Sequence, residues 1–135
     1  MPAGSTALGF AYYAGVKLAG YTAAAAYLRR ALPENRPPLL LVGATRTLIG
    51  LAAGFASVYL AGSIAVPRSE AMFLILLLPV RLVEWLVLIR LFYPKPAWSW
   101  PRSLKLAALG AGWSYLLDVP AVLSMFILPG GAWIC

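Results

Sequence analysis

Five ionisable side chains lie inside four long hydrophobic segments of this chain, and this feature constrains the fold more than any other. They are Lys17, Arg46, Arg81, Glu84 and Asp118. A charged side chain in the middle of an apolar membrane helix costs about 3 kcal/mol even on lenient insertion scales. Such residues therefore normally face the interior of a helix bundle, where they pair with one another or bind a ligand. The sequence thus predicts helices packed around a polar centre.

The composition is typical of a chain embedded in a bilayer. Hydrophobic residues make up 62% of the sequence, charged residues only 11%, and the mean hydropathy is +0.84. A soluble domain has about 25% charged residues. A chain of 135 residues has room for four spans of about 20 residues each. We therefore predict an all-α membrane protein, a four-helix transmembrane bundle that forms a single domain over residues 1–135.

Prolines and charges set the expected helix boundaries. The predicted helices cover residues about 7–28, 39–66, 71–93 and 104–128, with proline-containing connections at 31–38, 67–70 and 94–101. Proline cannot donate the hydrogen bond that a helix interior needs, so these connections are read as breaks. The residues before the first segment lack the basic region of a secretory signal, so we interpret that segment as a retained span.

The distribution of basic residues predicts an orientation. Most basic residues outside the spans lie in or beside loops 29–38 and 94–103, whereas the second loop balances one arginine against one glutamate. Loops rich in Lys and Arg stay on the cytoplasmic side. We therefore expect these two loops in the cytoplasm and the N- and C-termini outside, in a bacterial inner (plasma) membrane. The same reading assigns the net charge of +7 to topology, so no nucleic-acid partner is expected.

The depth of each buried charge predicts its partners. At about 1.5 Å per residue, Lys17, Arg81 and Asp118 lie roughly 15 Å below the outer face, and Arg46 and Glu84 lie nearer the cytoplasmic face. We predict that Lys17 and Arg81 surround Asp118 and that Arg46 pairs with Glu84. A pair between Arg81 and Glu84, three residues apart on one helix, is a further option.

The predicted centre holds three cations against two carboxylates. Either Lys17 is uncharged when buried, or an anion such as a phosphate, a carboxylate or a lipid headgroup completes the site. Three aromatic residues near the carboxylates are able to line an apolar pocket, although the favoured reading of them is ordinary aromatic core packing. The candidate substrate-binding residues are Lys17, Arg46, Arg81, Glu84, Trp85, Trp113, Tyr115 and Asp118.

The sequence leaves the function open among three readings. The first is the binding or transport of a small anionic or amphipathic molecule at the charge cluster. The second is a non-catalytic subunit of a larger membrane complex, in which buried pairs fix the helix packing. The third is an intramembrane lipid-modifying enzyme that uses Glu84 and Asp118; no catalytic residue can be assigned. The expected partners are the lipid bilayer, a small anionic or lipid ligand, and a homodimer or larger membrane complex.

Metal and cofactor chemistry finds no support in the sequence. The chain has no histidine and a single cysteine, Cys135, so the commonest transition-metal ligands are missing. No glycine-rich phosphate loop, nucleophile elbow or paired-cysteine motif is present. We therefore expect neither a metal nor a cofactor.

Overall fold

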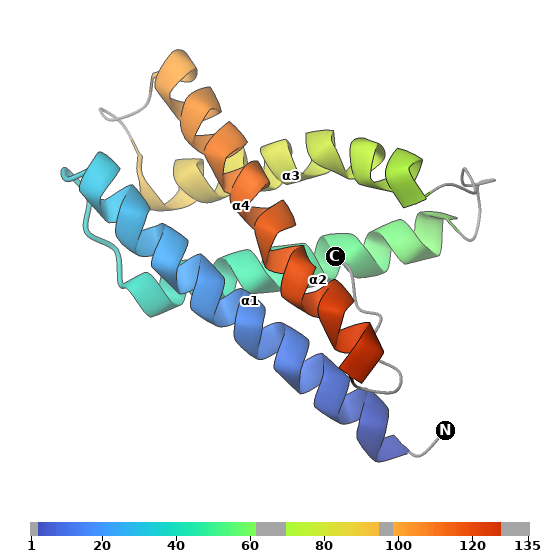
Figure 1. Cartoon of the computed structure of the whole chain (residues 1–135). Coiled ribbons are helices and arrows are strands. Elements are labelled where there is room, and N and C mark those ends of the chain that lie inside the picture. The colour runs from blue at the N-terminus through green and yellow to red at the C-terminus, as the bar shows by residue number, and fades with distance from the viewer. Residues whose placement is uncertain (1–2, 62–69, 95–98, 128–135) are drawn as a thin grey trace.

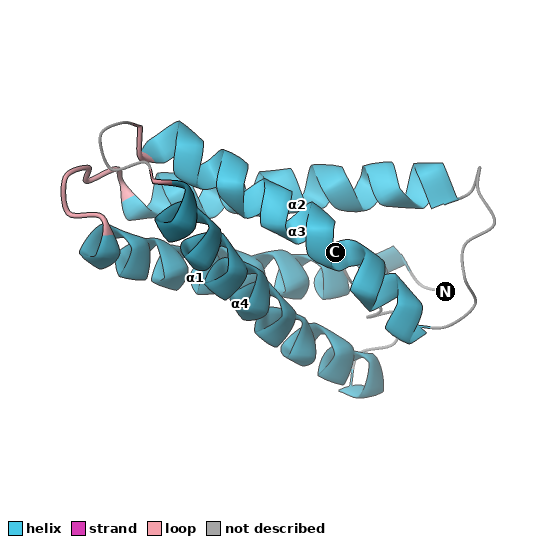
Figure 2. Cartoon of the chain, turned by 90° about the horizontal axis from the view of Figure 1, so that it is seen from above, coloured by secondary structure: helices cyan, strands magenta, loops and turns pink. Residues whose placement is uncertain are grey.

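The computed structural model of the protein describes residues 3–61, 70–94 and 99–127, and over these residues it is all helical, with four helices and no strand. Figure 1 shows α1 (Ala3–Ala31), α2 (Leu39–Ala61), α3 (Glu70–Phe92) and α4 (Trp100–Ile127). The helices run alternately in opposite directions, as Figure 2 also shows. The end of α1, the start of α2, the end of α3 and the start of α4 therefore lie at one end of the bundle, which we call the loop end. The predicted all-α, four-helix architecture is confirmed to this extent.

Two helices are longer than the sequence predicts. α1 continues past Arg29 and Arg30, since arginine is a good helix former and its charge is favourable at a helix C-terminus. The Leu32 N–H still donates to the Leu28 carbonyl at 2.8 Å, and Pro33 follows. α4 starts at Trp100 rather than at 104, because a proline such as Pro101 is tolerated in the first helical turn. The predicted helix end at 62–66 lies outside the described residues.

The four helices form a closed ring. Each packs against the next along the chain, and α4 packs against α1, so that α1 and α3 face each other diagonally, as do α2 and α4. The apolar core fills the half of this ring nearest the loop end. Its buried members are Tyr21, Ala25, Leu28, Leu32, Val42, Trp85, Leu88, Ile89, Tyr93, Leu106, Ala107 and Ala111. The buried charges begin where this core stops.

A glycine allows the closest approach between α1 and α2. A Cβ atom on Gly43 would lie 2.9 Å from the backbone nitrogen of Thr22 and closer still to its hydroxyl oxygen. Such a contact is too short for real Cβ atoms, and a helix backbone cannot move aside locally. A side chain at this position would therefore push the two helices apart.

The outward faces of the helices are strongly apolar. Large hydrophobic side chains that are more than half exposed occur on every helix, among them Leu8, Leu48, Ile75 and Leu116. By length and hydropathy, one helix in the described part of the chain qualifies as a candidate membrane span: the window Leu39–Ala56 of α2 has a mean hydropathy of 1.7. One such helix is weak evidence by itself, so four membrane spans stay a prediction.

Candidate functional site

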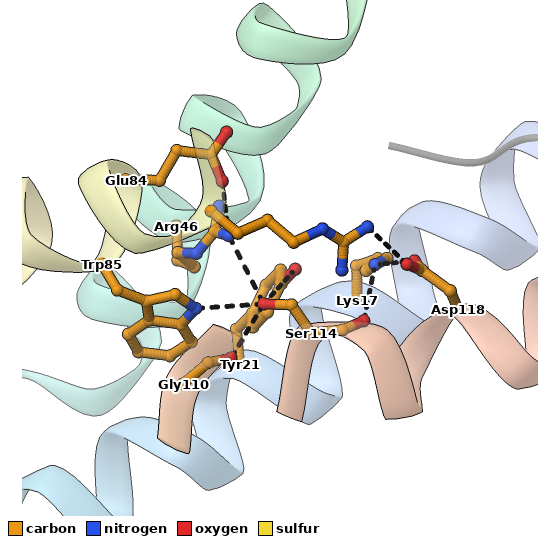
Figure 3. Close-up of polar contacts among 9 residues, drawn as sticks. Lys17, Tyr21, Arg46, Glu84, Trp85, Gly110, Ser114 and Asp118 are labelled. Atoms are coloured by element: carbon orange, nitrogen blue, oxygen red, sulfur yellow. Dashed lines mark hydrogen bonds and ion pairs between the residues drawn. The ribbon is translucent and has the colours of Figure 1, made fainter. Parts of the chain in front are cut away.

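The five buried charges meet at the centre of the ring. Lys17 of α1 and Arg81 of α3 both contact Asp118 of α4: the ammonium group pairs with Oδ1, and Arg81 Nη2 lies 2.5 Å from Oδ2. Arg46 Nη2 of α2 lies 2.6 Å from Glu84 Oε2 of α3. All five residues are at most 9% exposed. Figure 3 shows the labelled members converging on one another from the four helices.

The predicted pairing is confirmed in both parts. Lys17 and Arg81 flank Asp118, and Arg46 pairs with Glu84. The alternative pair within α3, between Arg81 and Glu84, is not among the ion pairs of the described residues. Each of the two instead reaches across to another helix. Depth along the helices therefore predicted the ion-pair partners better than residue spacing within one helix did.

Ser114 of α4 connects the two groups of charges. Its hydroxyl accepts a hydrogen bond from Trp85 Nε1 at 3.0 Å and donates to the Gly110 carbonyl at 3.0 Å. Arg46 Nη2 lies 3.4 Å from the same oxygen, and the Tyr21 hydroxyl lies 3.3 Å from it. The side chain is fully buried. Ser114 was not predicted as a site residue; its position one turn before Asp118 on the same helix face was the available signal.

Aromatic rings lie against each of the three cations. The Arg46 guanidinium carbon lies 4.8 Å from the Tyr21 ring and 5.2 Å from the Trp85 ring. The Arg81 guanidinium carbon lies 4.1 Å from the Tyr115 ring. Lys17 Nζ is 5.6 Å from the Tyr21 ring. A cation over an aromatic face gains about 0.5–2 kcal/mol when it is desolvated, so these rings lower the cost of burying the charges.

The cluster carries more positive charge than its carboxylates balance. Among the described residues of the cluster, three cations face two carboxylates, so their formal charges sum to +1 when all five are ionised. Four buried guanidinium nitrogens, Nε and Nη1 of Arg46 and of Arg81, have no hydrogen-bond partner within the described part of the chain. Gly50 leaves room beside Arg46, because a Cβ atom there would lie 3.2 Å from Nη1. The site therefore has spare N–H donors as well as spare charge.

The three aromatic residues near the carboxylates lie in two different places. Trp85 and Trp113 line a groove of about 480 Å³ between α1 and α4, whereas Tyr115 is not part of that groove and stacks on Arg81 instead. Tyr115 follows Ser114 by one residue, so it points about 100° further around the helix. Glu84 reaches a separate shallow groove beside Ile49 and Pro79. Among the described residues, the three aromatic side chains therefore do not line one common pocket.

The arrangement offers chemistry for holding an anion more readily than for proton transfer. Both carboxylates already contact cations, whereas the free N–H groups belong to arginines, whose planar groups suit carboxylate and phosphate oxygens. Comparisons of the chain with protein-family models, curated proteins and solved structures find no match. Function is therefore inferred from the cluster and from the helix faces around it.

Proposed function

We propose that the protein is a small integral membrane protein whose four helices span the bilayer, and that its central charge cluster binds a small anionic or amphipathic molecule. The distribution of polarity supports the membrane placement. A helix of a soluble bundle turns its charged face to water and its apolar face to the core. Here the charged side chains in the middle of each helix are buried, while side chains such as Leu48, Phe55 and Ile75, each about two-thirds exposed, point outward.

In a bilayer, lipid chains would cover these apolar helix faces and remove the free-energy cost of exposing them to water. Soluble monomers rarely expose contiguous apolar patches larger than a few hundred Å². Helices also satisfy their own backbone groups, as hydrocarbon requires. The candidate span in α2 agrees with this placement. The charged residues in the middle of the other three helices, Lys17, Arg81, Glu84 and Asp118, are buried among the helices.

Positive charge at the loop end supports the predicted orientation. Arg29 and Arg30 close α1, Arg90 lies near the end of α3, and Arg102 and Lys105 lie in the first turns of α4. We therefore propose that the loop end faces the cytoplasm. Cysteines introduced singly at Glu34 and at Ala3, in a Cys135→Ser background, test it. In right-side-out vesicles an impermeant maleimide should label only the second; the reverse pattern would overturn the orientation.

The excess of positive charge among the described residues of the cluster is the observation that carries the binding proposal. Excess buried charge is costly, and an anion placed against Arg46 and Arg81 would supply both negative charge and acceptors for their buried N–H groups that lack a hydrogen-bond partner. The surrounding rings of Tyr21, Trp85 and Tyr115 suit an apolar portion on the same molecule. The proposed ligand class is therefore a phosphate or carboxylate, alone or as the head of an amphiphile.

Lys17→Met tests this proposal without breaking the other pairs. The substitution leaves two cations and two carboxylates, so the Arg81–Asp118 and Arg46–Glu84 pairs persist and the protein should fold. Native mass spectrometry of gently extracted protein should show a stoichiometric small molecule in the wild type and in Lys17→Arg, and none in Lys17→Met. Added inorganic phosphate should likewise raise the melting temperature of the first two only. Equal behaviour of all three proteins would refute anion binding at the cluster.

A structural role is the second candidate, favoured by a specific observation. Every helix contributes at least one charged side chain to the cluster, so the ion pairs are able to fix the register of the whole ring, as expected of an accessory subunit of a larger membrane complex. This reading predicts that Lys17→Met changes stability but no ligand. It also predicts co-purifying polypeptides, or a second copy of the chain, in place of a small molecule.

A further inference from the structure

The groove between α1 and α4 is apolar along its length. Its walls are Ala23, Ala24, Tyr27 and Leu28 of α1 with Leu106, Leu109, Gly110 and Trp113 of α4, and Trp85 forms its floor. Tyr27 and Leu109 are both more than half exposed. Almost all of the lining is carbon, so the groove suits a hydrocarbon chain and offers little to a polar ligand.

Two hydrogen bonds between α1 and α4 mark the ends of the groove. At the loop end the exposed Arg102 donates to the Ala31 carbonyl. At the inner end Trp113 Nε1 donates to the Gly20 carbonyl at 2.9 Å. The lining residues on α4, from Leu106 to Trp113, span about 10 Å at 1.5 Å per residue. The groove therefore fits within one leaflet, whose hydrocarbon is half of the roughly 30 Å core of a bilayer.

Basic side chains stand at the loop end of the same groove. Arg102 lies one turn before Leu106 on the groove face of α4, and Lys105 lies one turn before Leu109. On α1, Arg30 lies three residues after Tyr27. Residues three or four apart share a helix face, so these cations flank the groove mouth. No acidic residue occurs in α4 before Asp118.

We propose that the groove holds one acyl chain of an anionic phospholipid from the leaflet at the loop end, with the lipid phosphate against Arg102 and its basic neighbours. The inference rests on the membrane placement proposed above, but not on anion binding at the charge cluster. The bound chain lies against Trp85, whose Nε1 group contacts Ser114 on the other side. The lipid site is thus separated from the cluster by a single indole ring.

Two variants remove the two halves of the site. Ala23→Trp fills the groove with a large side chain, and Ala52→Trp is its control, since Ala52 is an exposed alanine of α2 that lines none of the grooves described above. Arg102→Gln removes the charge at the mouth. Arg36→Gln removes an exposed charge from the loop at the same end and is the matched control.

Lipid titration in native mass spectrometry measures the result, with dioleoyl phosphatidylglycerol and dioleoyl phosphatidylcholine as probes. The wild type should bind one phosphatidylglycerol per chain in preference to phosphatidylcholine. Arg102→Gln should lower that preference by about fivefold, the effect expected for one basic residue at a membrane surface. Ala23→Trp should abolish stoichiometric binding of either lipid, and both controls should resemble the wild type.

The outcomes separate this inference from the proposed function. Equal binding of the two lipids, or stoichiometric lipid on Ala23→Trp, overturns the lipid site even when cysteine labelling supports four spans. Conversion of a dimer into a monomer by Ala23→Trp, with lipid binding unchanged, also overturns it, because the occupant would then be a second copy of the chain. Lys17→Met should leave lipid binding intact; loss of the lipid in that variant would show that the probe binds at the cluster.

Discussion

Removing the Arg46–Glu84 pair one partner at a time, and then both together, is the sharpest test of the cluster as a unit. Both side chains are almost fully buried, and their charged atoms lie 2.6 Å apart. Arg46→Met leaves the Glu84 carboxylate buried without its cation. Glu84→Met leaves the guanidinium among aromatic rings. The double methionine variant removes both charges and keeps similar side-chain volume.

The magnitudes follow from the contacts of each residue. Breaking one side of a buried ion pair costs about 3–5 kcal/mol, whereas replacing the whole pair by apolar residues is often neutral. Arg46→Met should lie in the upper part of that range. Glu84→Met should lie near about 3 kcal/mol, because the Tyr21 and Trp85 rings still stabilise the cation. The double variant should lie within about 2 kcal/mol of the wild type, since it loses only those ring contacts and the weak contact to Ser114.

Unfolding in mixed micelles, followed by tryptophan fluorescence as the denaturing detergent is raised, gives the four free energies of the cycle. The expected coupling energy is at least about 3 kcal/mol. Single variants within about 0.5 kcal/mol of the wild type would show that the charges are solvated rather than buried. A double variant that costs the sum of the two singles would show that they do not act as a pair. Either result would refute the proposed geometry.

A charge swap is a weaker test of the same pair. Arg46→Glu with Glu84→Arg restores opposite charges, but it places a carboxylate against the faces of Tyr21 and Trp85. An aromatic face is negative and repels an anion. We therefore expect the swap to recover only part of the stability and of the expression lost in the single variants, and an incomplete recovery would not argue against pairing.

Further substitutions test the packing around the cluster by the same unfolding measurement. Ser114→Ala should destabilise the protein by about 1–3 kcal/mol, because it leaves the buried Trp85 N–H without its acceptor. Adding Trp85→Phe to Ser114→Ala should recover part of that loss only if the unpaired N–H is its cause. Gly110→Ala should destabilise by about 1–3 kcal/mol, since its Cβ would overlap the Trp85 ring, whereas Gly112→Ala faces open space and should be neutral or slightly stabilising. Gly43→Ala should separate α1 from α2 and destabilise the protein by a similar amount.

The helices and the ion pairs were predictable because both follow from the positions of residues along the chain. Prolines such as Pro33 and Pro94 limit where helices continue, and a fixed rise per residue places Lys17, Arg81 and Asp118 at one level. Antiparallel neighbours joined by short loops then bring those levels together. The helix ends were less predictable, since arginines and a first-turn proline extend α1 and α4 beyond the hydrophobic segments.

The contacts that complete the site depend on helix rotation, which the sequence did not determine. Ser114 and Tyr115 are adjacent, but one joins the centre and the other stacks on Arg81. Tyr21 also escaped prediction, although it lies one turn after Lys17 on the same face. Which side of a helix faces inward is decided by neighbours such as Trp85, whose ring contacts Tyr21 at a centroid distance of 6.0 Å. The rotation of each helix about its axis is therefore known only once the packed bundle is known.

The side chain of Trp85 lies between the charge cluster and the groove that α1 and α4 form, and contacts both. Its Nε1–H contacts Ser114 and its ring faces Arg46, while the same side chain forms the groove floor. Gly110 of α4 packs directly against the Trp85 ring, because even a methyl group at this position would overlap the indole. A displacement of Trp85 by an occupant of the groove must therefore change the hydrogen bond to Ser114 or the contact with Arg46. Packing that transmits strain in this way links the outer surface of the bundle to the charge cluster at its centre.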